Sequence, residues 1–193
     1  SHQYVSREGA KVAGLDINNS RIITCHIGNG SSVTAIKNGK VVDTSMGFTP
    51  LEGMIMGTRC GIIDANIVPY IMKKEGLTPD EMTDILNKKS GFIGLSGKSS
   101  DMRDVVGFAE GGDERAQLVV DKLVLDITKL VAAYIAELVL QFGGIKIDKE
   151  VNDRTRDAAI ISAADSTAKV ALIPTDEELM IARDTMRLTK DLK

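Results

Sequence analysis

A glycine-rich turn early in the chain carries the residues best suited to bind an anion. It reads His-Ile-Gly-Asn-Gly-Ser-Ser over residues 26–32. Glycine lets the backbone pass close to a ligand and take positive φ, and successive amide N–H groups in such a turn can converge on an anion. Asn29 and the two serines add neutral hydrogen-bond donors. The sequence therefore predicts a phosphate-binding loop, and the alternative is a hairpin turn whose glycines serve the backbone alone.

Two other nucleotide-binding motifs are excluded by their spacing. The turn at 26–32 is followed by a strand-like segment, whereas the dinucleotide fingerprint requires a helix there. The segment GFIGLSGKS at 91–99 is similar to a Walker-type phosphate loop, but that template needs glycine where the chain has Phe92. Neither motif is therefore expected.

Arg59 and Asp101 are charged residues that are candidates for ligand binding. Arg59 lies in Gly-Thr-Arg-Cys-Gly at 57–61, and a guanidinium pairs with carboxylate or phosphate without losing its charge. The alternative is an ordinary surface arginine. Asp101 opens Asp-Met-Arg at the expected start of a helix. There it serves either as a helix cap or in a site for phosphate or ribose.

Glu177 and Glu178 are the acidic residues that could bind a metal ion. They open the last expected helix, directly after a strand-like run. We expect Thr175 to cap this helix, with Glu178 as its capping-box partner. Glu177 then has no structural task and is the better candidate for a magnesium ligand. His2 and His26 are the only histidines in the sequence, which is too few for a zinc site.

Short strands and glycine-bounded helices are expected to position these residues. The β-branched run at 21–27 predicts a strand, and further strands at 32–36 and 40–45 are separated by an Asn-Gly hairpin signal. Helices are expected at 67–74, 79–89, 101–111, 113–140 and 175–187. Glycine-rich loops are expected at 46–61 and 91–97, and a polar connector and a strand at 168–173 follow Gly144. This order favours an α/β domain of the ribonuclease-H-like type over a doubly wound one.

Composition and charge restrict the partners and the compartment. The net charge is −3, with Lys and Arg dispersed along the chain, which argues against nucleic acid or an anionic membrane as the main partner. The longest apolar run, at 130–140, contains Glu137 and predicts a buried helix rather than a membrane span. No signal-peptide pattern is expected, and Cys25 and Cys60 give no disulfide framework. A cytoplasmic protein is therefore expected.

Taken in order, these segments resemble the acetate kinase family. The resemblance is carried by SHQYVS from Ser1, ITCHIGNGSSVTAIKNGKVVDTSMGFTPLEGMIMGTRCG from Ile23, NKKSGFIGLSGKSSDMRD from Asn87 and IPTDEELMIARDT from Ile173. It implies the ribonuclease-H-like, actin-like ATPase fold of the acetate and sugar kinase, heat-shock cognate and actin superfamily. It further implies reversible phosphoryl transfer from ATP to acetate, giving acetyl phosphate and ADP, by a homodimer that uses Mg²⁺ or Mn²⁺.

The resemblance also assigns roles to individual residues. It implies a phosphate-binding loop formed by His26, Ile27, Gly28, Asn29 and Gly30. It implies that the nucleotide is contacted by Asp101, Met102 and Arg103. His2 and Arg59 match residues that stabilise the transferring phosphoryl group. Glu177 matches the magnesium-binding glutamate of the family.

Parts of the family pattern have no counterpart in this sequence. Nothing corresponds to the N-terminal domain with its acetate pocket and catalytic aspartate, so residues 1–193 are expected to form a C-terminal nucleotide-binding and dimerisation domain. A strand and glycine-rich turn that hold adenosine are also missing, and a gap is expected near 138–142. Two alternatives remain: a propionate or butyrate kinase of the same family, and a catalytically inactive fragment that binds nucleotide and dimerises.

Overall fold

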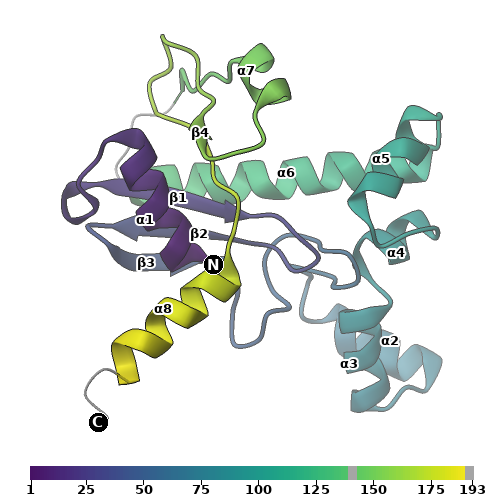
Figure 1. The fold of residues 1–193 in the computed structure, drawn as a ribbon. Helices are drawn as coiled ribbons and strands as arrows, with labels where there is room; N and C mark the ends of the chain where they lie inside the picture. The colour runs from purple at the N-terminus through teal and green to yellow at the C-terminus, as the bar shows by residue number, and fades with distance from the viewer. Residues whose placement is uncertain (139–142, 190–193) are drawn as a thin grey trace. The chain divides into compact units, whose positions relative to one another are not determined.

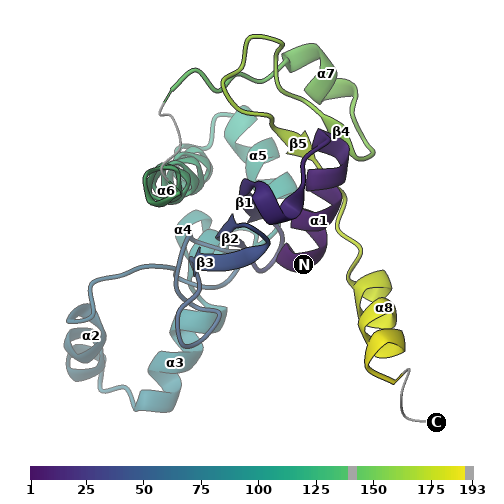
Figure 2. The same ribbon diagram turned by 90° about the vertical axis from the view of Figure 1, so that its left-hand side faces the viewer.

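The computed structural model describes residues 1–138 and 143–189 of the chain. These residues form two compact units whose elements are drawn in Figures 1 and 2. The predicted gap near 138–142 lies, from residue 139 onward, outside the described residues. Unit 1 draws its described residues from three ranges: Ser1–Thr24, Thr34–Asp43 and Tyr134–Lys193. Unit 2 draws its residues from Cys25–Val33 and Thr44–Ala133.

A three-stranded sheet is built from β1 (Arg21–His26), β2 (Ser32–Lys37) and β3 (Lys40–Thr44), in that order. Asn38 and Gly39, between β2 and β3, have φ of 52° and 74°, the positive values that a tight hairpin turn requires. The central strand β2 is buried from its first residue to the last but one. All three predicted strands are confirmed to within one residue at each end.

Five helices follow the sheet: α2 (Ile67–Glu75), α3 (Pro79–Lys88), α4 (Gly91–Ser96), α5 (Met102–Glu110) and α6 (Glu114–Glu137). α2 contacts α3, and α4 contacts α5 (Figure 1). The predicted capping box of α3 is confirmed, because Thr78 accepts from the Glu81 amide while Glu81 accepts from the Thr78 amide. The buried core of unit 2 includes Met54, Met56, Phe92, Val105, Ala116, Val119 and Leu123.

The segment at 91–97, predicted as a loop, is instead the short helix α4. Phe92 and Ser96 are buried, and Gly97 ends the helix in the left-handed conformation with φ of 70°. The first amides of α4 are satisfied from outside, because Phe92 N–H donates to Met56 O and Ile93 N–H donates to Gly57 O. A helix this rich in glycine forms because tertiary packing outweighs its weak propensity.

Lys98, which would be the phosphate-binding lysine of a Walker loop, has partners within the protein. Its ammonium pairs with the carboxylate of Asp113 and lies 5.1 Å from the centroid of the Phe108 ring. The structure thus agrees with the exclusion of that motif on spacing.

Unit 1 contains a second, smaller sheet and several helices. β4 (Ala159–Ile160) pairs antiparallel with β5 (Ala171–Leu172), so the strand predicted at 168–173 is reduced to two residues. α1 (His2–Ala13) contacts both strands and the 3₁₀ turn η1 (Ile17–Asn19). The remaining helices are α7 (Lys149–Arg154) and α8 (Glu177–Thr189). Within the described ranges, no helix combines the length and hydropathy that crossing a membrane requires.

α1, η1, α7 and β4 are not among the elements predicted from the sequence. The buried residues of α1 are Ser6, Ala10 and Ala13, which are spaced as on one helix face. Gly14, with φ of 65°, ends this helix and is the signal that could have located it.

Candidate functional site

The turn between β1 and β2 exposes backbone amides that have no partner within residues 1–138 and 143–189. Ser31 is buried, and its hydroxyl accepts from Gly28 N–H at 3.2 Å and donates to Gly28 O at 3.0 Å. This pair of bonds fixes the base of the turn. Within the described structure, the amides of Asn29 and Gly30 make no hydrogen bond, and Asn29 is exposed. Exposed amides of this kind favour binding of an anion.

Gly28 and Gly30 allow neighbouring side chains to approach the turn closely, and neither has a positive φ. The described glycines with positive φ do not include Gly28 or Gly30, which corrects that part of the sequence-based expectation. A Cβ atom added at Gly28 would lie 3.2 Å from His26 Nε2, and one added at Gly30 would lie 3.1 Å from Arg59 Nη1. A side chain at either position would therefore press on a polar group of the predicted site.

Arg59 lies beside the turn, as the approach of its guanidinium to Gly30 shows. Its Nη1 donates to Pro50 O at 3.2 Å and lies 3.7 Å from Met56 Sδ. With the described residues it forms no ion pair, so only neutral atoms contact its charge. A half-buried guanidinium with no carboxylate partner is suited to bind phosphate or carboxylate from a ligand.

The backbone around Arg59 is fixed by a neighbouring loop and helix. Thr58 O accepts from Ser90 N–H at 3.0 Å, and Cys60 N–H donates to Leu86 O at 3.0 Å. A Cβ atom at Gly57 would lie 2.5 Å from Asn29 Oδ1 and 2.9 Å from the carbonyl oxygen of Ser100. The turn, the Arg59 segment and the approach to α5 therefore meet at one place in unit 2.

Asp101 caps α5 and also binds Arg103. Its Oδ1 accepts from the Arg103 amide at 2.9 Å and from Arg103 Nε at 3.0 Å, while Oδ2 accepts from Arg103 Nη2 at 2.5 Å. Hydrogen bonds from the Arg103 side chain, and then from its amide, lower the pKa of Asp101 to about 2. The same pair raises the pKa of Arg103. Both groups are therefore charged at neutral pH.

A cavity of about 550 Å³ in unit 2 brings two of the predicted segments together. Three of its lining residues come from the turn, namely Ile27, Gly28 and Asn29, and three from the start of α5, namely Asp101, Met102 and Arg103. Ser100, Phe92 and Leu123 also line it and were not predicted. The position of Ser100 before Asp101 was a usable signal, whereas Phe92 and Leu123 belong to helices whose packing the sequence does not reveal.

The other two predicted site residues, His2 and Glu177, belong to unit 1. His2 Nδ1 lies 2.7 Å from Thr24 Oγ1. Glu177 is the first residue of α8, and Asp176 caps that helix by accepting from Leu179 N–H at 2.9 Å. The predicted cap Thr175 instead lies 3.3 Å, oxygen to oxygen, from the hydroxyl of Ser1. The structural reason for preferring Glu177 over Glu178 is therefore wrong, and the preference rests on the resemblance alone.

The single carboxylate of Glu177 fits a metal ion whose other ligands are mainly phosphate oxygens of the substrate. Within the described residues, no three His, Cys, Asp or Glu side chains converge as a metal site would require. Mg²⁺ commonly uses one or two protein carboxylates together with phosphate oxygens and water. A single carboxylate at Glu177 is compatible with that arrangement.

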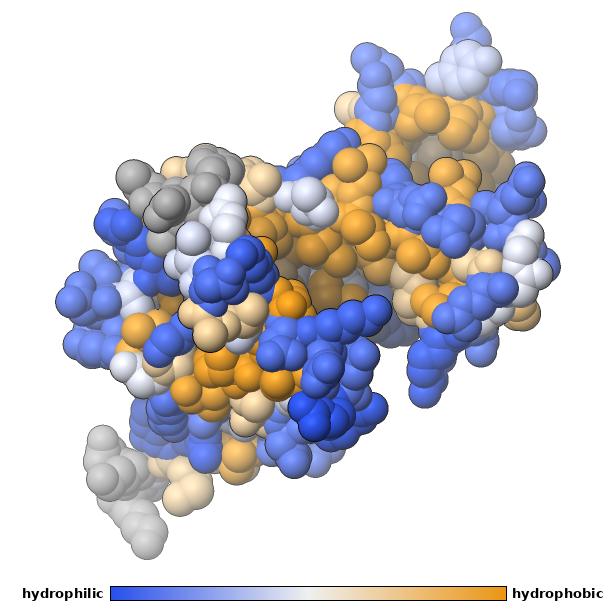
Figure 3. All heavy atoms as spheres, turned by 90° about the horizontal axis from the view of Figure 1, so that it is seen from above, coloured by the Kyte–Doolittle hydropathy of each residue, from blue (hydrophilic) through white to orange (hydrophobic). Residues whose placement is uncertain are grey.

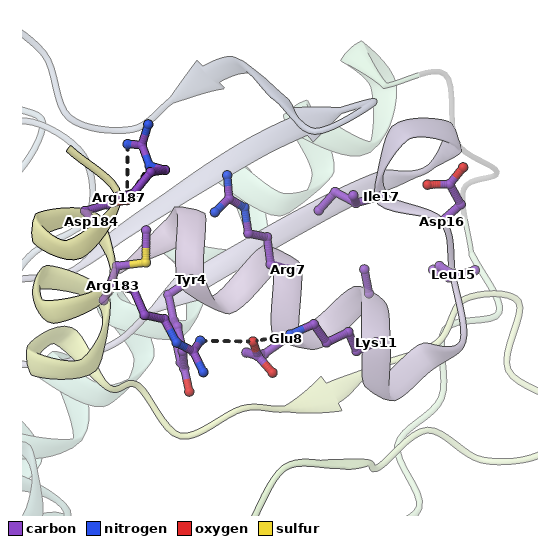
Figure 4. Close-up of a pocket in the computed structure, with 12 residues that line it drawn as sticks. Tyr4, Arg7, Glu8, Lys11, Leu15, Asp16, Ile17, Arg183, Asp184 and Arg187 are labelled. Atoms are coloured by element: carbon purple, nitrogen blue, oxygen red, sulfur yellow. Dashed lines mark hydrogen bonds and ion pairs between the residues drawn. The ribbon is translucent and has the colours of Figure 1, made fainter. Parts of the chain in front are cut away.

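A second cavity, of about 530 Å³, lies in unit 1 between α1 and α8 (Figure 4). Most of its charges are paired: Glu8 accepts from Lys11 at 2.7 Å and lies 3.6 Å from Arg183. These contacts, with that from Lys11 the largest, lower the pKa of Glu8. The cavity has no exposed glycine turn, so the unit 2 cavity is the better candidate for binding phosphate.

Comparison with known proteins identifies relatives of this chain. The model of the acetokinase family matches residues 1–141 and 138–183. The acetate kinase of Clostridioides difficile (strain 630) is 48% identical over 215 residues, covering 98% of this chain and 54% of that protein. The acetate kinase of Helicobacter hepaticus is 47% identical over 218 residues, covering 100% of this chain and 54% of that protein. The chain thus spans about half the length of the curated relatives it matches.

Two solved structures show the same fold. The Porphyromonas gingivalis acetate kinase superposes with a TM-score of 0.92 at 40% identity, covering 97% of this chain and 53% of that chain. A propionate kinase from Francisella tularensis gives a TM-score of 0.84 at 36% identity, covering 95% of this chain and 53% of that chain. The fold is therefore the ribonuclease-H-like, actin-like ATPase fold predicted from the sequence. Because the family model matches nearly all of its length, the chain belongs to the acetokinase family.

Proposed function

We propose that this chain is the nucleotide-binding part of an enzyme that transfers a phosphoryl group reversibly between ATP and acetate. One observation carries the proposal: Arg59, with no carboxylate partner, lies beside a turn whose Asn29 and Gly30 amides are free of hydrogen bonds to the described residues. These groups suit the phosphate tail of a nucleotide. The names of the relatives, acetate kinases among them, supply the acceptor acid.

In the proposed reaction, an oxygen of acetate attacks the γ-phosphorus of ATP in line with the leaving group. The new oxygen–phosphorus bond forms as the bond from the γ-phosphorus to the β–γ bridging oxygen breaks, and that oxygen leaves on ADP. Such a transfer depends mainly on positioning and charge stabilisation. We assign stabilisation of the phosphoryl oxygens to Arg59 and His2, and binding of the nucleotide to 26–30 and 101–103.

Mg²⁺ or Mn²⁺, held by the nucleotide phosphates and by Glu177, would neutralise phosphate charge during the transfer. We also propose a homodimer in the cytoplasm. Two observations support this. Leu118 and Leu125, seven positions apart on α6, are exposed, and the described surface carries further apolar patches (Figure 3). Cys25 and Cys60 are both free thiols, as a reducing compartment would keep them.

Propionate is the second candidate acceptor, because the Francisella propionate kinase also superposes closely. Measuring kcat/KM of the complete protein for acetate, propionate and butyrate separates the candidates. We expect the largest value for acetate, and a larger value for propionate or butyrate would reassign the substrate.

Replacement of Arg59 in the complete protein tests the proposed chemistry. We expect Arg59→Ala to lower kcat by about 100-fold or more, since it removes charge stabilisation of the transition state. Arg59→Lys keeps the charge but not the bidentate geometry, so its kcat should lie between those of wild type and Arg59→Ala. Arg154 is an exposed arginine of α7, and the control variant Arg154→Ala should have the kcat of wild type. Near-normal turnover of Arg59→Ala would remove Arg59 from this role.

A further inference from the structure

The segment just before Arg59 is buried and depends on an acceptor from α6. Met54 and Met56 are fully buried and Ile55 is 4% exposed. A buried backbone amide that lacks a hydrogen bond is costly, so the amide of Ile55 needs a partner. That partner is the side chain of Asp126, whose Oδ2 accepts from Ile55 N–H at 3.2 Å.

The carboxylate of Asp126 is held in place by a second contact. Its side chain is 13% exposed, and Lys122, one helical turn earlier on α6, donates to both of its oxygens. The lysine balances the charge of this nearly buried carboxylate and fixes its orientation. Asp126 is thus a rigid acceptor presented by a helix to a loop.

The loop transmits this constraint from Ile55 to Arg59 through one residue. Met56 N–H donates to Arg59 O at 3.2 Å, and Met56 Sδ lies 3.7 Å from Arg59 Nη1. On its other side, Met56 O accepts from Phe92 N–H at 2.9 Å. A displacement of Ile55 therefore moves Met56, which contacts both the main chain and the guanidinium of Arg59.

We propose that Asp126, oriented by Lys122, is a positioning residue for Arg59. It acts through Ile55 and Met56 and does not contact substrate. This inference rests on the proposed function, in which the guanidinium stabilises the transferring phosphoryl group. Misplacing a catalytic group by about 1 Å can lower the rate by about 100-fold, so a loss of this constraint is measurable as a fall in kcat.

The test uses variants of the complete protein. We expect Asp126→Ala to lower kcat about 10-fold or more, with KM for ATP changed less than about 2-fold. The amide oxygen of Asp126→Asn can accept from Ile55 N–H and from Lys122 together, as Oδ2 of Asp126 does, so its kcat should stay within about 3-fold of wild type. Asp126→Asn/Lys122→Met removes the lysine altogether and keeps the acceptor for Ile55, so its kcat should also stay within about 3-fold of wild type. Asp121→Ala, which removes an exposed acceptor of Gln117 on the same helix, is the control and should leave kcat unchanged.

The two asparagine variants separate positioning from a purely structural ion pair, because they keep the acceptor for Ile55 and lose the charge of Asp126. If Asp126 mattered only through its ion pair, the Asp126→Asn/Lys122→Met enzyme would be slow, and the inference would be overturned. Thermal unfolding verifies that each variant folds. If Asp126→Ala does not fold, the Asp126→Asn pair decides the question, because it retains an oxygen and a similar volume at that position.

A double-mutant cycle with Arg59 separates failure of this inference from failure of the proposed function. If Asp126 acts through Arg59, Asp126→Ala should lower kcat by less than about 2-fold in an Arg59→Ala background. Additive losses, or a normal kcat for Asp126→Ala beside a slow Arg59→Ala, would overturn the positioning role alone. Normal turnover of Arg59→Ala would remove Arg59 from the proposed mechanism, and a wild-type protein that transfers phosphate to none of acetate, propionate and butyrate would overturn the proposed function itself.

Discussion

Gly28, Gly30 and Gly57 place backbone where a larger residue would press on a polar side chain of the site. The groups they approach are His26 Nε2, Arg59 Nη1 and Asn29 Oδ1, respectively. The sequence pattern Gly-Asn-Gly located this turn correctly. It could not show which atoms approach the glycines, because Arg59 and Gly57 come from a segment far along the chain. The reason for each glycine therefore follows from tertiary structure.

The pair of Asp101 and Arg103 gives a prediction about pH at the scale of single residues. The pKa of Asp101 is lowered to about 2, mainly by the Arg103 side chain, whereas an unperturbed aspartate titrates near about 3.9. A lowered pKa in the folded state means that the contribution of this pair to stability is present above about pH 4. It is lost as the pH falls toward about 2.

Removing the guanidinium of Arg103 should shift the titration of the Asp101 carboxyl group. We expect Arg103→Met to raise the pKa of Asp101, though not fully to the unperturbed value, because the amide of residue 103 still donates to Oδ1. NMR titration of the Asp101 carboxyl carbon in both proteins measures the shift, and Asp121, outside this pair, serves as the internal reference. An unchanged titration midpoint for Asp101 would show that the side chain of Arg103 is not the main cause.

At the scale of elements, local signals predicted the structure where local chemistry decides it. The Asn38-Gly39 turn and the Thr78 capping box are satisfied by atoms a few residues apart, and both were predicted from the sequence. The helix α4 was missed because its first amides bond to Met56 and Gly57, far earlier in the chain. α1 was not predicted, although its buried residues Ser6, Ala10 and Ala13 recur with helical spacing.

Gly91 joins α4 to the Arg59 segment, and its replacement should destabilise the protein. Its φ is 60°, and a Cβ atom there would lie 2.0 Å from Met56 O and 2.7 Å from Arg59 O, both backbone atoms. Neither atom can move without disturbing the buried loop. We expect Gly91→Ala to lower the free energy of unfolding by about 2–4 kcal/mol in chemical denaturation.

Gly107→Ala in α5 is the matched control for that measurement. Its added Cβ meets no atom within 4 Å. Alanine is favoured over glycine inside a helix, so this variant should be stabilised by about 0.5–1 kcal/mol. Equal stabilities of the two variants would contradict the role assigned to Gly91.

At the scale of the whole molecule, the groups proposed to bind the phosphate tail are concentrated in one unit. The turn at 26–30, Arg59 and the start of α5 at 101–103 all belong to unit 2. The family was recognisable from four sequence segments, and two of them, from Ile23 and from Asn87, contain these loops. Binding of a phosphate tail is thus a property that can be measured on the chain described here, although the chain spans about half the length of its relatives.

We therefore expect these 193 residues on their own to bind ATP with magnesium weakly and to show no turnover with acetate. Asn29→Asp is nearly isosteric and places a negative charge in the turn, so it should weaken ATP binding by about 10-fold in calorimetry. Asn66→Asp makes the same charge change at the exposed start of α2, where Asn66 makes no side-chain cap bond, and should bind like wild type. If both variants bound ATP like wild type, the phosphates would lie away from the turn, and the assignment of 26–30 as the phosphate-binding loop would be wrong.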